Sequence, residues 1–123
     1  GFRTLSPGRM MNASTVIVVN RDGMGQAEPA LSHKLLKAYL NMLDLDDRLP
    51  RAICFYAEGV KMTVPGSPVL EELESLAGKG VPLIVCTTCL NHFGVFDDLA
   101  VGTAGGMKDI VDAQDAASKV ITL

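Results

Sequence analysis

The sequence predicts an α/β fold in three layers, with a mostly parallel, five-stranded sheet between helices. Short apolar runs rich in β-branched residues alternate along the chain with amphipathic segments of helical period. The runs are continuously apolar, which favours strands that are buried on both faces of a parallel sheet. At 123 residues and 48% hydrophobic residues, the chain is long enough to build one core of this kind. Right-handed crossovers are expected between the strands.

The first predicted strand covers residues 14–20, STVIVVN, and a loop over residues 20–25 follows it. Apolar residues at three- and four-residue spacing then predict a helix of about 18 residues. These residues are Leu31, Leu35, Ala38, Tyr39 and Met42. Leu36, Leu40 and Leu43 widen the apolar face. A face this broad can cover the sheet and also meet another subunit, and deep burial is the commoner explanation.

A second strand is predicted over residues 52–57, AICFYA, where Cys54 is interpreted as a small buried hydrophobe. Residues 58–64 are too apolar for a solvated linker and are expected to form an ordered loop that folds back over the site. Ser67 as N-cap and Pro68 at the first helical position predict the start of the next helix.

The remaining elements continue the alternation of helices and strands. The helix after Ser67 is expected to bury Leu70, Leu73, Leu76 and Ala77 and to stop at Gly78 and Gly80. The elements predicted after it are a strand over 81–85, a short helix over 88–93, a strand over 99–102, a helix from Met107 and a strand over 119–123.

Charge and composition exclude several classes of function. Eleven basic and fourteen acidic residues give a formal charge of −3, and no basic run is present, so nucleic acid is not an expected partner. No apolar run approaches the roughly 18 residues of a membrane span. Three cysteines without a secretory signal indicate the cytoplasm, where thiols stay reduced. Residues 1–13 are expected to be a disordered leader or a cloning scar, and residues 14–123 a single domain.

Cys86 and Cys89 follow the third predicted strand at the point where it becomes a helix. If Thr87 is the N-cap, Cys86 lies just before the helix and Cys89 in its first turn, where free N–H groups lower the pKa of a thiol. Three readings of the pair remain open: a thioredoxin-like dithiol, a metal site and a sulfur carrier. For zinc, His92 would give a third ligand, but only the distant His33 and Cys54 remain as a fourth.

The loop after the first strand carries Gly23 and Gly25, a spacing that also occurs in the fingerprint of dinucleotide-binding sites. Glu28 stands where the third glycine of that fingerprint is required, and its carboxylate would repel pyrophosphate. Two readings remain. The loop is a tight turn, or its N–H groups, with Asn20 and Arg21, line the crevice that holds Cys86.

Glu58 and Lys61 follow the second strand and are expected at the same edge of a parallel sheet. Lys61 could stabilise a thiolate or an anionic sulfur species. A solvated surface pair is the alternative interpretation. Thr87 and Thr88, between the two cysteines, complete the set of residues expected at the site.

Residues 58–95, EGVKMTVPGSPVLEELESLAGKGVPLIVCTTCLNHFGV, resemble the DsrE-like domain of YedF-type proteins, which are described as sulfurtransferase-like and linked to selenium metabolism. The shared motifs are Gly-Val-Lys, Gly-Ser-Pro-Val-Leu-Glu-Glu-Leu, Cys-x-Thr-Cys-Leu and a later Gly-x-x-x-Gly-Gly-Met-x-Asp-Ile from Gly102. The resemblance runs from about Ser14 onward. The chain departs from it at Thr87, where glycine is common. Residues 1–123 also do not include the TusA-like domain that often precedes this one in YedF-type proteins, so the chain is expected either to work with a separate carrier or to be cut from a longer protein.

The resemblance implies a three-layer α/β/α fold, homo-oligomers (dimers, trimers or hexamers) and a TusA-like sulfur carrier protein as a partner. It places the sulfur-accepting cysteine at Cys86, because residues 80–86, GVPLIVC, match the strand that precedes the acceptor in this group. Cys89 is shared only with the narrower YedF-type group and would resolve or support the persulfide.

The sequence therefore predicts a cytoplasmic carrier of sulfur, or of selenium, that acts through a persulfide on Cys86 as a sulfurtransferase, without a cofactor or metal. Two alternatives remain: a non-catalytic oligomeric binding or assembly module, and a thiol–disulfide redox protein.

Overall fold

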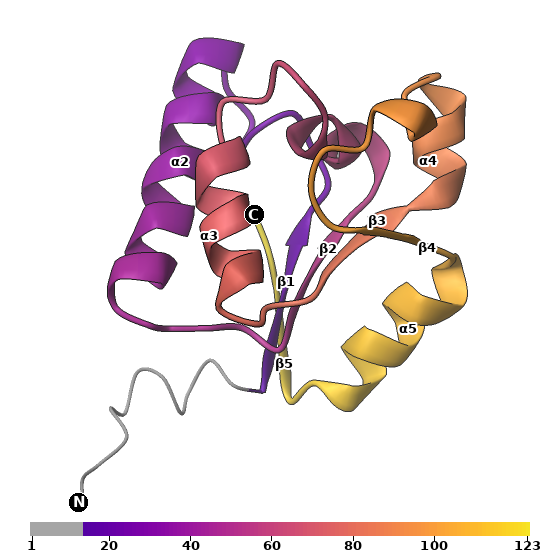
Figure 1. Cartoon of the computed structure of the whole chain (residues 1–123). Coiled ribbons are helices and arrows are strands. Elements are labelled where there is room, and N and C mark those ends of the chain that lie inside the picture. Colours follow the sequence, from indigo (N-terminus) through magenta and orange to yellow (C-terminus); the bar gives the residue numbers. More distant parts are fainter. Residues whose placement is uncertain (1–13) are drawn as a thin grey trace, which may run out of the picture.

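Strand β1 (Thr15–Val19) lies inside the sheet, and all five of its residues are buried. It pairs in parallel with β2 (Ala52–Phe55) on one side and with β5 (Lys119–Thr122) on the other. The computed structural model describes residues 14–123 (Figure 1). The expectation for residues 1–13 lies outside this described range.

The sheet has five strands in the order β4-β3-β2-β1-β5. β3 (Leu83–Cys86) pairs with β2, and β4 (Thr103–Gly105) pairs with β3, so that every pairing in the sheet is parallel. The predicted three-layer α/β/α fold with a five-stranded sheet is confirmed. Because the strands are parallel, their carboxyl ends meet at one edge, where Cys86 closes β3.

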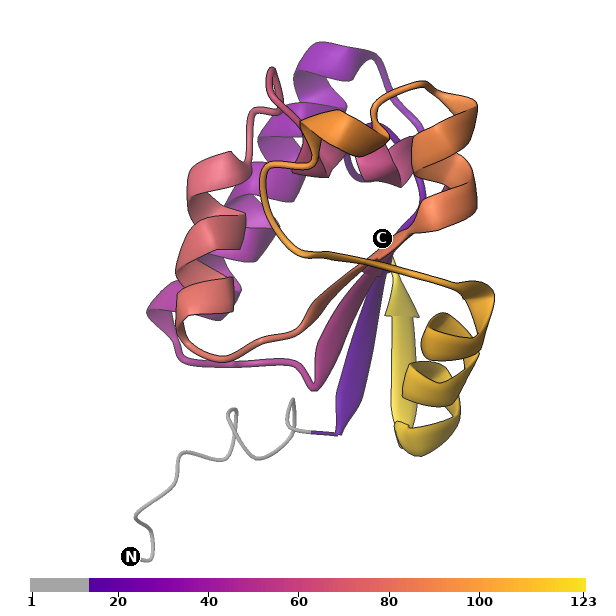
Figure 2. The ribbon, with the colours of Figure 1, turned by 45° about the vertical axis from the view of Figure 1, so that its right-hand side comes forward.

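Helices α2 (Pro29–Leu45) and α3 (Leu70–Gly78) lie side by side on one face of the sheet, and α5 (Met107–Ala116) lies on the other (Figures 1 and 2). The long helix from Pro29 and the helix from Met107 were both predicted.

The face of α2 that is buried against the sheet is not centred on Leu31, Leu35 and Met42, as the sequence predicted. Its buried residues include Leu36, Leu40 and Leu43, which the sequence assigned only to the margin of the apolar face. The other apolar stripe of α2 faces solvent. Its large residues are Leu31, Leu35, Met42 and Leu45. Two apolar stripes on one helix have the same period, so spacing alone did not decide which one meets the sheet.

Residues that were predicted as a loop form the 3-10 helix η1 (Ala57–Thr63) at the carboxyl edge of the sheet. Four of its seven residues are buried, namely Gly59, Val60, Met62 and Thr63. Gly59 lies directly against β1, because a Cβ atom added there would stand 2.0 Å from the carbonyl oxygen of Val19. η1 is therefore fixed to the end of β1.

Helix α3 begins later than its start signal predicted. The Ser67 hydroxyl accepts a hydrogen bond from the N–H of Val69 at 3.1 Å, which closes a local turn. Val69 is then the N-cap, and the helix runs from Leu70. Serine and proline thus mark the turn before the helix and not its first residues.

The prediction of a strand over residues 99–102 is wrong, since β4 covers Thr103–Gly105. The N–H of Ala100 donates to the carbonyl of Thr63 at 2.8 Å, which ties this segment to η1 instead of the sheet. Gly102 then has a φ of +86°, outside the extended region, and the strand starts after it.

The short helix α4 (Thr87–His92) follows β3 without a break, and the 3-10 turn η2 (Phe96–Asp98) follows it. Figures 1 and 2 show η1 and α4 together beyond the carboxyl ends of the strands. No helix within residues 14–123 is long and apolar enough to cross a membrane.

Candidate functional site

Cys86 is the last residue of β3 and also the N-cap of α4, with extended backbone angles of φ −62° and ψ 117°. The helix thus starts one residue earlier than was predicted with Thr87 as the cap. In the sheet, Cys86 is paired with Gly105 of β4, and only 2% of its surface is exposed. The cysteine that the sequence favours as acceptor is therefore the more deeply buried of the pair.

Cys89 lies in the first turn of α4 and is partly exposed. Its Sγ accepts a hydrogen bond from the backbone N–H of Ala57, with 3.1 Å between the two atoms. Ala57 holds this N–H in place with a φ of +52°, an uncommon conformation for a residue with a side chain. A backbone amide thus faces the sulfur of Cys89.

The pKa of Cys89 is raised, chiefly because burial disfavours the thiolate. The Ala57 amide acts in the opposite direction, and the neighbouring Cys86 thiol, which forms a hydrogen bond with Cys89, raises the pKa further. The two thiols are therefore in contact. A Cys89 thiol that keeps its proton can donate a hydrogen bond to the sulfur of Cys86.

Cys54 stands apart from this pair in the middle of β2, with no exposed surface. Burial raises the pKa of its thiol to about 11. The prediction that Cys54 is a small buried core residue is confirmed. A thiol that is protonated and inaccessible is not a nucleophile under ordinary conditions.

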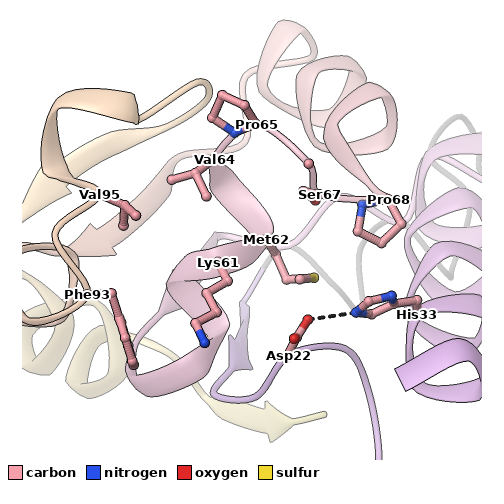
Figure 3. Close-up of a pocket in the computed structure, with 11 residues that line it drawn as sticks. Asp22, His33, Lys61, Met62, Val64, Pro65, Ser67, Pro68, Phe93 and Val95 are labelled. Atoms are coloured by element: carbon pink, nitrogen blue, oxygen red, sulfur yellow. Dashed lines mark hydrogen bonds and ion pairs between the residues drawn. The ribbon is translucent and has the colours of Figure 1, made fainter. Parts of the chain in front are cut away.

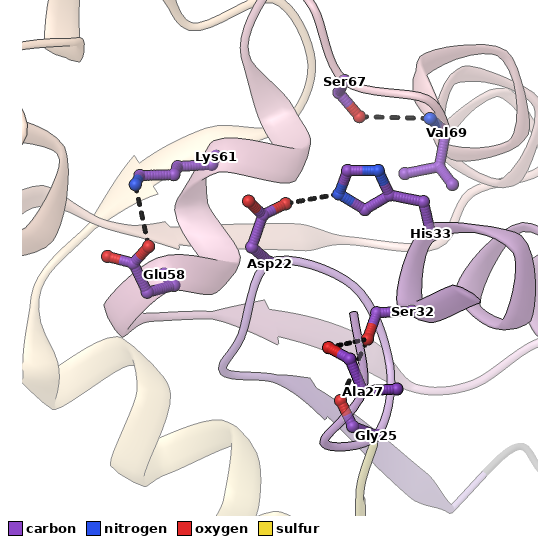
Figure 4. A network of polar contacts seen from close by, with 9 residues as sticks. All are labelled: Asp22, Gly25, Ala27, Ser32, His33, Glu58, Lys61, Ser67 and Val69. Carbon is purple, nitrogen blue, oxygen red and sulfur yellow. Dashed lines mark hydrogen bonds and ion pairs between the residues drawn. The ribbon is translucent and has the colours of Figure 1, made fainter. Parts of the chain in front are cut away.

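The glycine loop after β1 is fixed to the first turns of α2. Gly23 has a φ of +122°, and a Cβ atom there would lie 2.6 Å from that of Ser32. The Ser32 hydroxyl is within hydrogen-bonding distance of the carbonyl oxygens of Gly25, at 3.3 Å, and Ala27, at 3.2 Å (Figure 4). The close contact at Gly23 and a φ of +77° at Gly25 are both typical of glycines in a tight turn.

A hydrogen-bonded pair and an ion pair lie near the carboxyl edge of the sheet (Figure 4). Nε2 of His33, on α2, is 2.6 Å from Oδ1 of Asp22, in the loop after β1. Nζ of Lys61 is 2.8 Å from Oε1 of Glu58, and it also lies 4.6 Å from the ring centroid of Phe93. The first pair links a loop to a helix, and the second lies within η1.

Asp22, His33 and Lys61 line a cavity of about 440 Å³ (Figure 3). The rest of its lining comes from η1, the loop that follows η1 and the end of α4. These residues are Met62, Val64, Pro65, Gly66, Ser67, Pro68, Phe93 and Val95. The cavity combines apolar walls with charged groups of both signs.

The structure brings some of the predicted site residues together and separates others. Cys86 and Cys89 are in contact, and Thr87 and Thr88 lie between them on α4. Lys61 and Glu58 form one pair, and Lys61 faces the cavity. The predicted residues outside its lining are Asn20, Arg21, Gly23, Gly25, Glu58, Thr87, Thr88, Cys86 and Cys89.

Sequence reasoning missed the Asp22–His33 pair and the amide of Ala57. Asp22 stands after a strand, which is a weak signal, but nothing in the sequence pairs it with His33 eleven residues on. Within residues 14–123, no group of three or more His, Cys, Asp or Glu side chains is placed to hold a metal ion, so His92 does not complete a ligand set with the cysteines.

Residues 13–123 match the DsrE/DsrF-like family. This chain belongs to that family. Similar solved structures include the ychN protein from E. coli, at 19% identity and a TM-score of 0.66, covering 89% of this chain and 99% of the other. A protein of unknown function, MTH1491 from Methanobacterium thermoautotrophicum, is 23% identical, with a TM-score of 0.65 and coverage of 90% and 99%.

A third similar structure is BT1422 from Bacteroides thetaiotaomicron, at 14% identity, a TM-score of 0.66 and coverage of 89% and 95%. At these identities the likeness shows a shared DsrE/DsrF-like fold. A comparison with curated proteins returned no match.

Proposed function

We propose that this DsrE/DsrF-like protein carries sulfur as a persulfide, with Cys86 as the acceptor and Cys89 as the supporting thiol. The family is associated with sulfur relay. The observation that carries the proposal is the contact between the two thiols where β3 passes into α4. Selenium would be carried at the same place by the same chemistry.

The transfer step conserves atoms and electrons. The Cys86 thiolate attacks the terminal sulfur of a persulfide donor, the donor's S–S bond breaks, and the donor leaves as a thiolate. The product is a persulfide on Cys86. Cys89, which holds its proton more firmly than a free thiol, stabilises the attacking sulfur by hydrogen bonding.

Cys89 can also resolve the persulfide. Its thiolate attacks the inner sulfur of the Cys86 persulfide, which releases hydrosulfide and leaves a Cys86–Cys89 disulfide. An external thiol then reduces that disulfide. Of the two sulfurs, Cys89 is the more exposed, so an incoming thiol from a carrier of the TusA-like kind would meet it first.

The narrower relationship to YedF-type proteins is part of this proposal. It is supported by the Cys-x-Thr-Cys-Leu sequence over residues 86–90, which supplies the second thiol.

Mass spectrometry of the reduced protein after treatment with a sulfane-sulfur donor tests the acceptor. We expect one sulfur atom, about 32 Da, on the peptide that carries Cys86. Cys86→Ser should abolish the adduct. Cys89→Ser should keep the adduct and lengthen its lifetime when no other thiol is present, because the Cys86–Cys89 disulfide can no longer form. Cys54→Ser is the matched control and should load like the wild type, because Cys54 lies buried in the core.

Loading that persists in Cys86→Ser would contradict the assignment of Cys86. A wild-type protein that takes up no sulfur, but forms the Cys86–Cys89 disulfide with a mild oxidant, would instead favour the thiol–disulfide redox protein. The contact between the two thiols is the observation that supports this second candidate.

A further inference from the structure

The cavity beside η1 has the size and lining of a small-molecule site. Its volume of about 440 Å³ falls within the range of ligand pockets. Met62, Val64 and Pro68 supply apolar surface, and Met62 and Val64 are themselves buried in the core. An apolar group of a ligand would find walls on more than one side.

Charged groups of both signs face the same space. Figure 3 shows Asp22 below Met62 and between Lys61 and His33, with Phe93 on the far side of Lys61. An ionised carboxylate only accepts hydrogen bonds, so Nε2 of His33 donates to Oδ1 of Asp22. This bond holds the carboxylate in place and leaves its second oxygen able to accept another donor.

The charges select against ligands of a single sign. An anion drawn to Lys61 would also meet the carboxylate of Asp22, and a cation drawn to Asp22 would meet the ammonium of Lys61. A ligand that carries one charge of each sign, a few bonds apart, matches both groups.

The present partner of Lys61 is replaceable. The side chains of Lys61 and Glu58 are 39% and 47% exposed, and an ion pair at that exposure contributes little to stability. A ligand carboxylate can therefore take the place of Glu58 at a small cost, while the Phe93 ring continues to support the ammonium group from 4.6 Å.

We propose that this cavity binds an amino-acid-type zwitterion, with its carboxylate on Lys61, its ammonium on Asp22, and an apolar or sulfur-bearing side chain against Met62, Val64 and Phe93. No residue of the cysteine pair lines the cavity, so binding itself does not require Cys86 or Cys89.

The cavity lies one helical turn from the cysteine pair along two elements. Ala57, which contacts Cys89, precedes Lys61 by four residues of 3-10 helix, a rise of about 8 Å. Cys89 precedes Phe93 by four residues at the end of α4, a rise of about 6 Å. A ligand side chain directed past Phe93 therefore extends toward the cysteine pair.

If the protein carries sulfur as proposed above, the geometry assigns its sulfur donor to the class of amino-acid persulfides. Cysteine persulfide is the simplest member of this class. The Cys86 thiolate takes the terminal sulfur, the S–S bond of the amino acid breaks, and the free amino acid leaves as its thiolate. No external oxidant or reductant takes part.

Calorimetric titration of the Cys86→Ser/Cys89→Ser double variant with L-methionine tests the binding claim without sulfur transfer, since a thioether cannot exchange. Two analogues serve as comparisons, one without the ammonium group and one without the carboxylate. We expect methionine to bind at least about tenfold more tightly than either analogue, because each analogue loses one charged hydrogen bond to the cavity.

Substitutions in the same background assign each contact. Lys61→Met should remove the preference for the carboxylate, and Asp22→Asn the preference for the ammonium group. The matched controls Lys108→Met and Asp112→Asn alter an exposed ion pair on α5 and should bind methionine like the parent. Equal affinity for all three compounds, no binding of methionine, or an equal loss in the controls would overturn the proposal.

Loading of the wild-type protein separates this proposal from the proposed function. Lys61→Met should slow sulfur uptake from cysteine persulfide by about tenfold at low donor concentration, but should leave uptake from inorganic polysulfide unchanged. If neither donor loads the wild type while methionine still binds, the persulfide function fails and the zwitterion site stands. If both donors load both proteins equally, the assignment of the donor class fails.

Discussion

The three cysteines differ in what surrounds each sulfur atom. Cys54 lies in the middle of a strand, Cys86 at the end of one, and Cys89 one helical turn beyond, with the amide of Ala57 facing its sulfur. The spacing of Cys86 and Cys89 predicted their proximity, because residues three apart on a helix share a face. The contact with Ala57 could not be predicted, since a positive φ at alanine has no signature in the sequence.

The buried thiol of Cys54 makes the stability of the protein depend on pH. Its pKa is raised to about 11 in the folded state, so between about 9 and 11 the unfolded chain loses a proton that the folded chain retains. The unfolded state then binds fewer protons, and stability falls as pH rises through this interval. The loss is at most about 3 kcal/mol.

Urea denaturation at a series of pH values measures this effect. Wild type should lose stability between pH 9 and 11, and Cys54→Ala should lose clearly less over the same interval, although it is less stable at neutral pH. Burial also raises the pKa of Tyr39, but both proteins retain this residue. The difference between the two slopes of stability against pH therefore reports on Cys54 alone. Identical slopes would show that Cys54 does not titrate in this way.

At the scale of elements, η1 decides the shape of the site. The sequence predicted order for residues 58–64 but not a 3-10 helix, because the segment is bounded by turn residues and has no helical period. Its position comes from tertiary contact: Gly59 lies against the carbonyl of Val19, and only a residue without a Cβ atom fits there.

Gly59→Ala should therefore detach η1 from β1. A Cβ atom at 2.0 Å from a backbone oxygen requires a shift of the main chain, and we expect a loss of about 3 kcal/mol in the free energy of unfolding. Gly78→Ala, at the end of α3, is the matched control. No heavy atom stands within 4 Å of its added Cβ, and a gain of about 0.5–1 kcal/mol is expected.

Chemical denaturation of the two variants gives the comparison. The detachment of η1 should also lower the affinity for methionine, because Lys61 and Met62 belong to this element. Equal stability of Gly59→Ala and Gly78→Ala would contradict the close packing of η1 on β1.

For the whole molecule, the sequence predicted the parallel sheet, its three layers and most elements, because periodicity and turn residues report on burial at each strand and helix. It misplaced β4, a strand of three residues whose extent depends on pairing with β3. It also predicted the wrong apolar stripe of α2 as the centre of the buried face. The Asp22–His33 pair and the cavity come from contacts between segments, on which local patterns carry no information.

The exposed stripe of α2 supports the expectation that the protein is a homo-oligomer. Leu31, Leu35, Met42 and Leu45 are 45%, 42%, 53% and 71% exposed and recur at helical spacing. Such a stripe is typical of a surface that another protein covers. We expect the wild type to sediment as an oligomer and Leu35→Glu/Leu45→Glu to sediment as a smaller species.

Val111→Glu is the control for this experiment. Val111 is 52% exposed but lies on α5, across the sheet from α2, so the substitution should leave the oligomer intact. A monomeric wild type, or an oligomer unaffected by charges on α2, would contradict the assignment of this surface.

The position of β5 beside β1 has a consequence for biosynthesis. The carbonyl of Ser14 accepts a hydrogen bond from the N–H of Ser118, 104 residues along the chain. A ribosome needs about 5–20 s to make that length, and throughout this time the second edge of the most buried strand has no partner. An unpaired apolar edge invites pairing with other chains. This edge of β1 is covered only after residues 119–122 have emerged and paired with it.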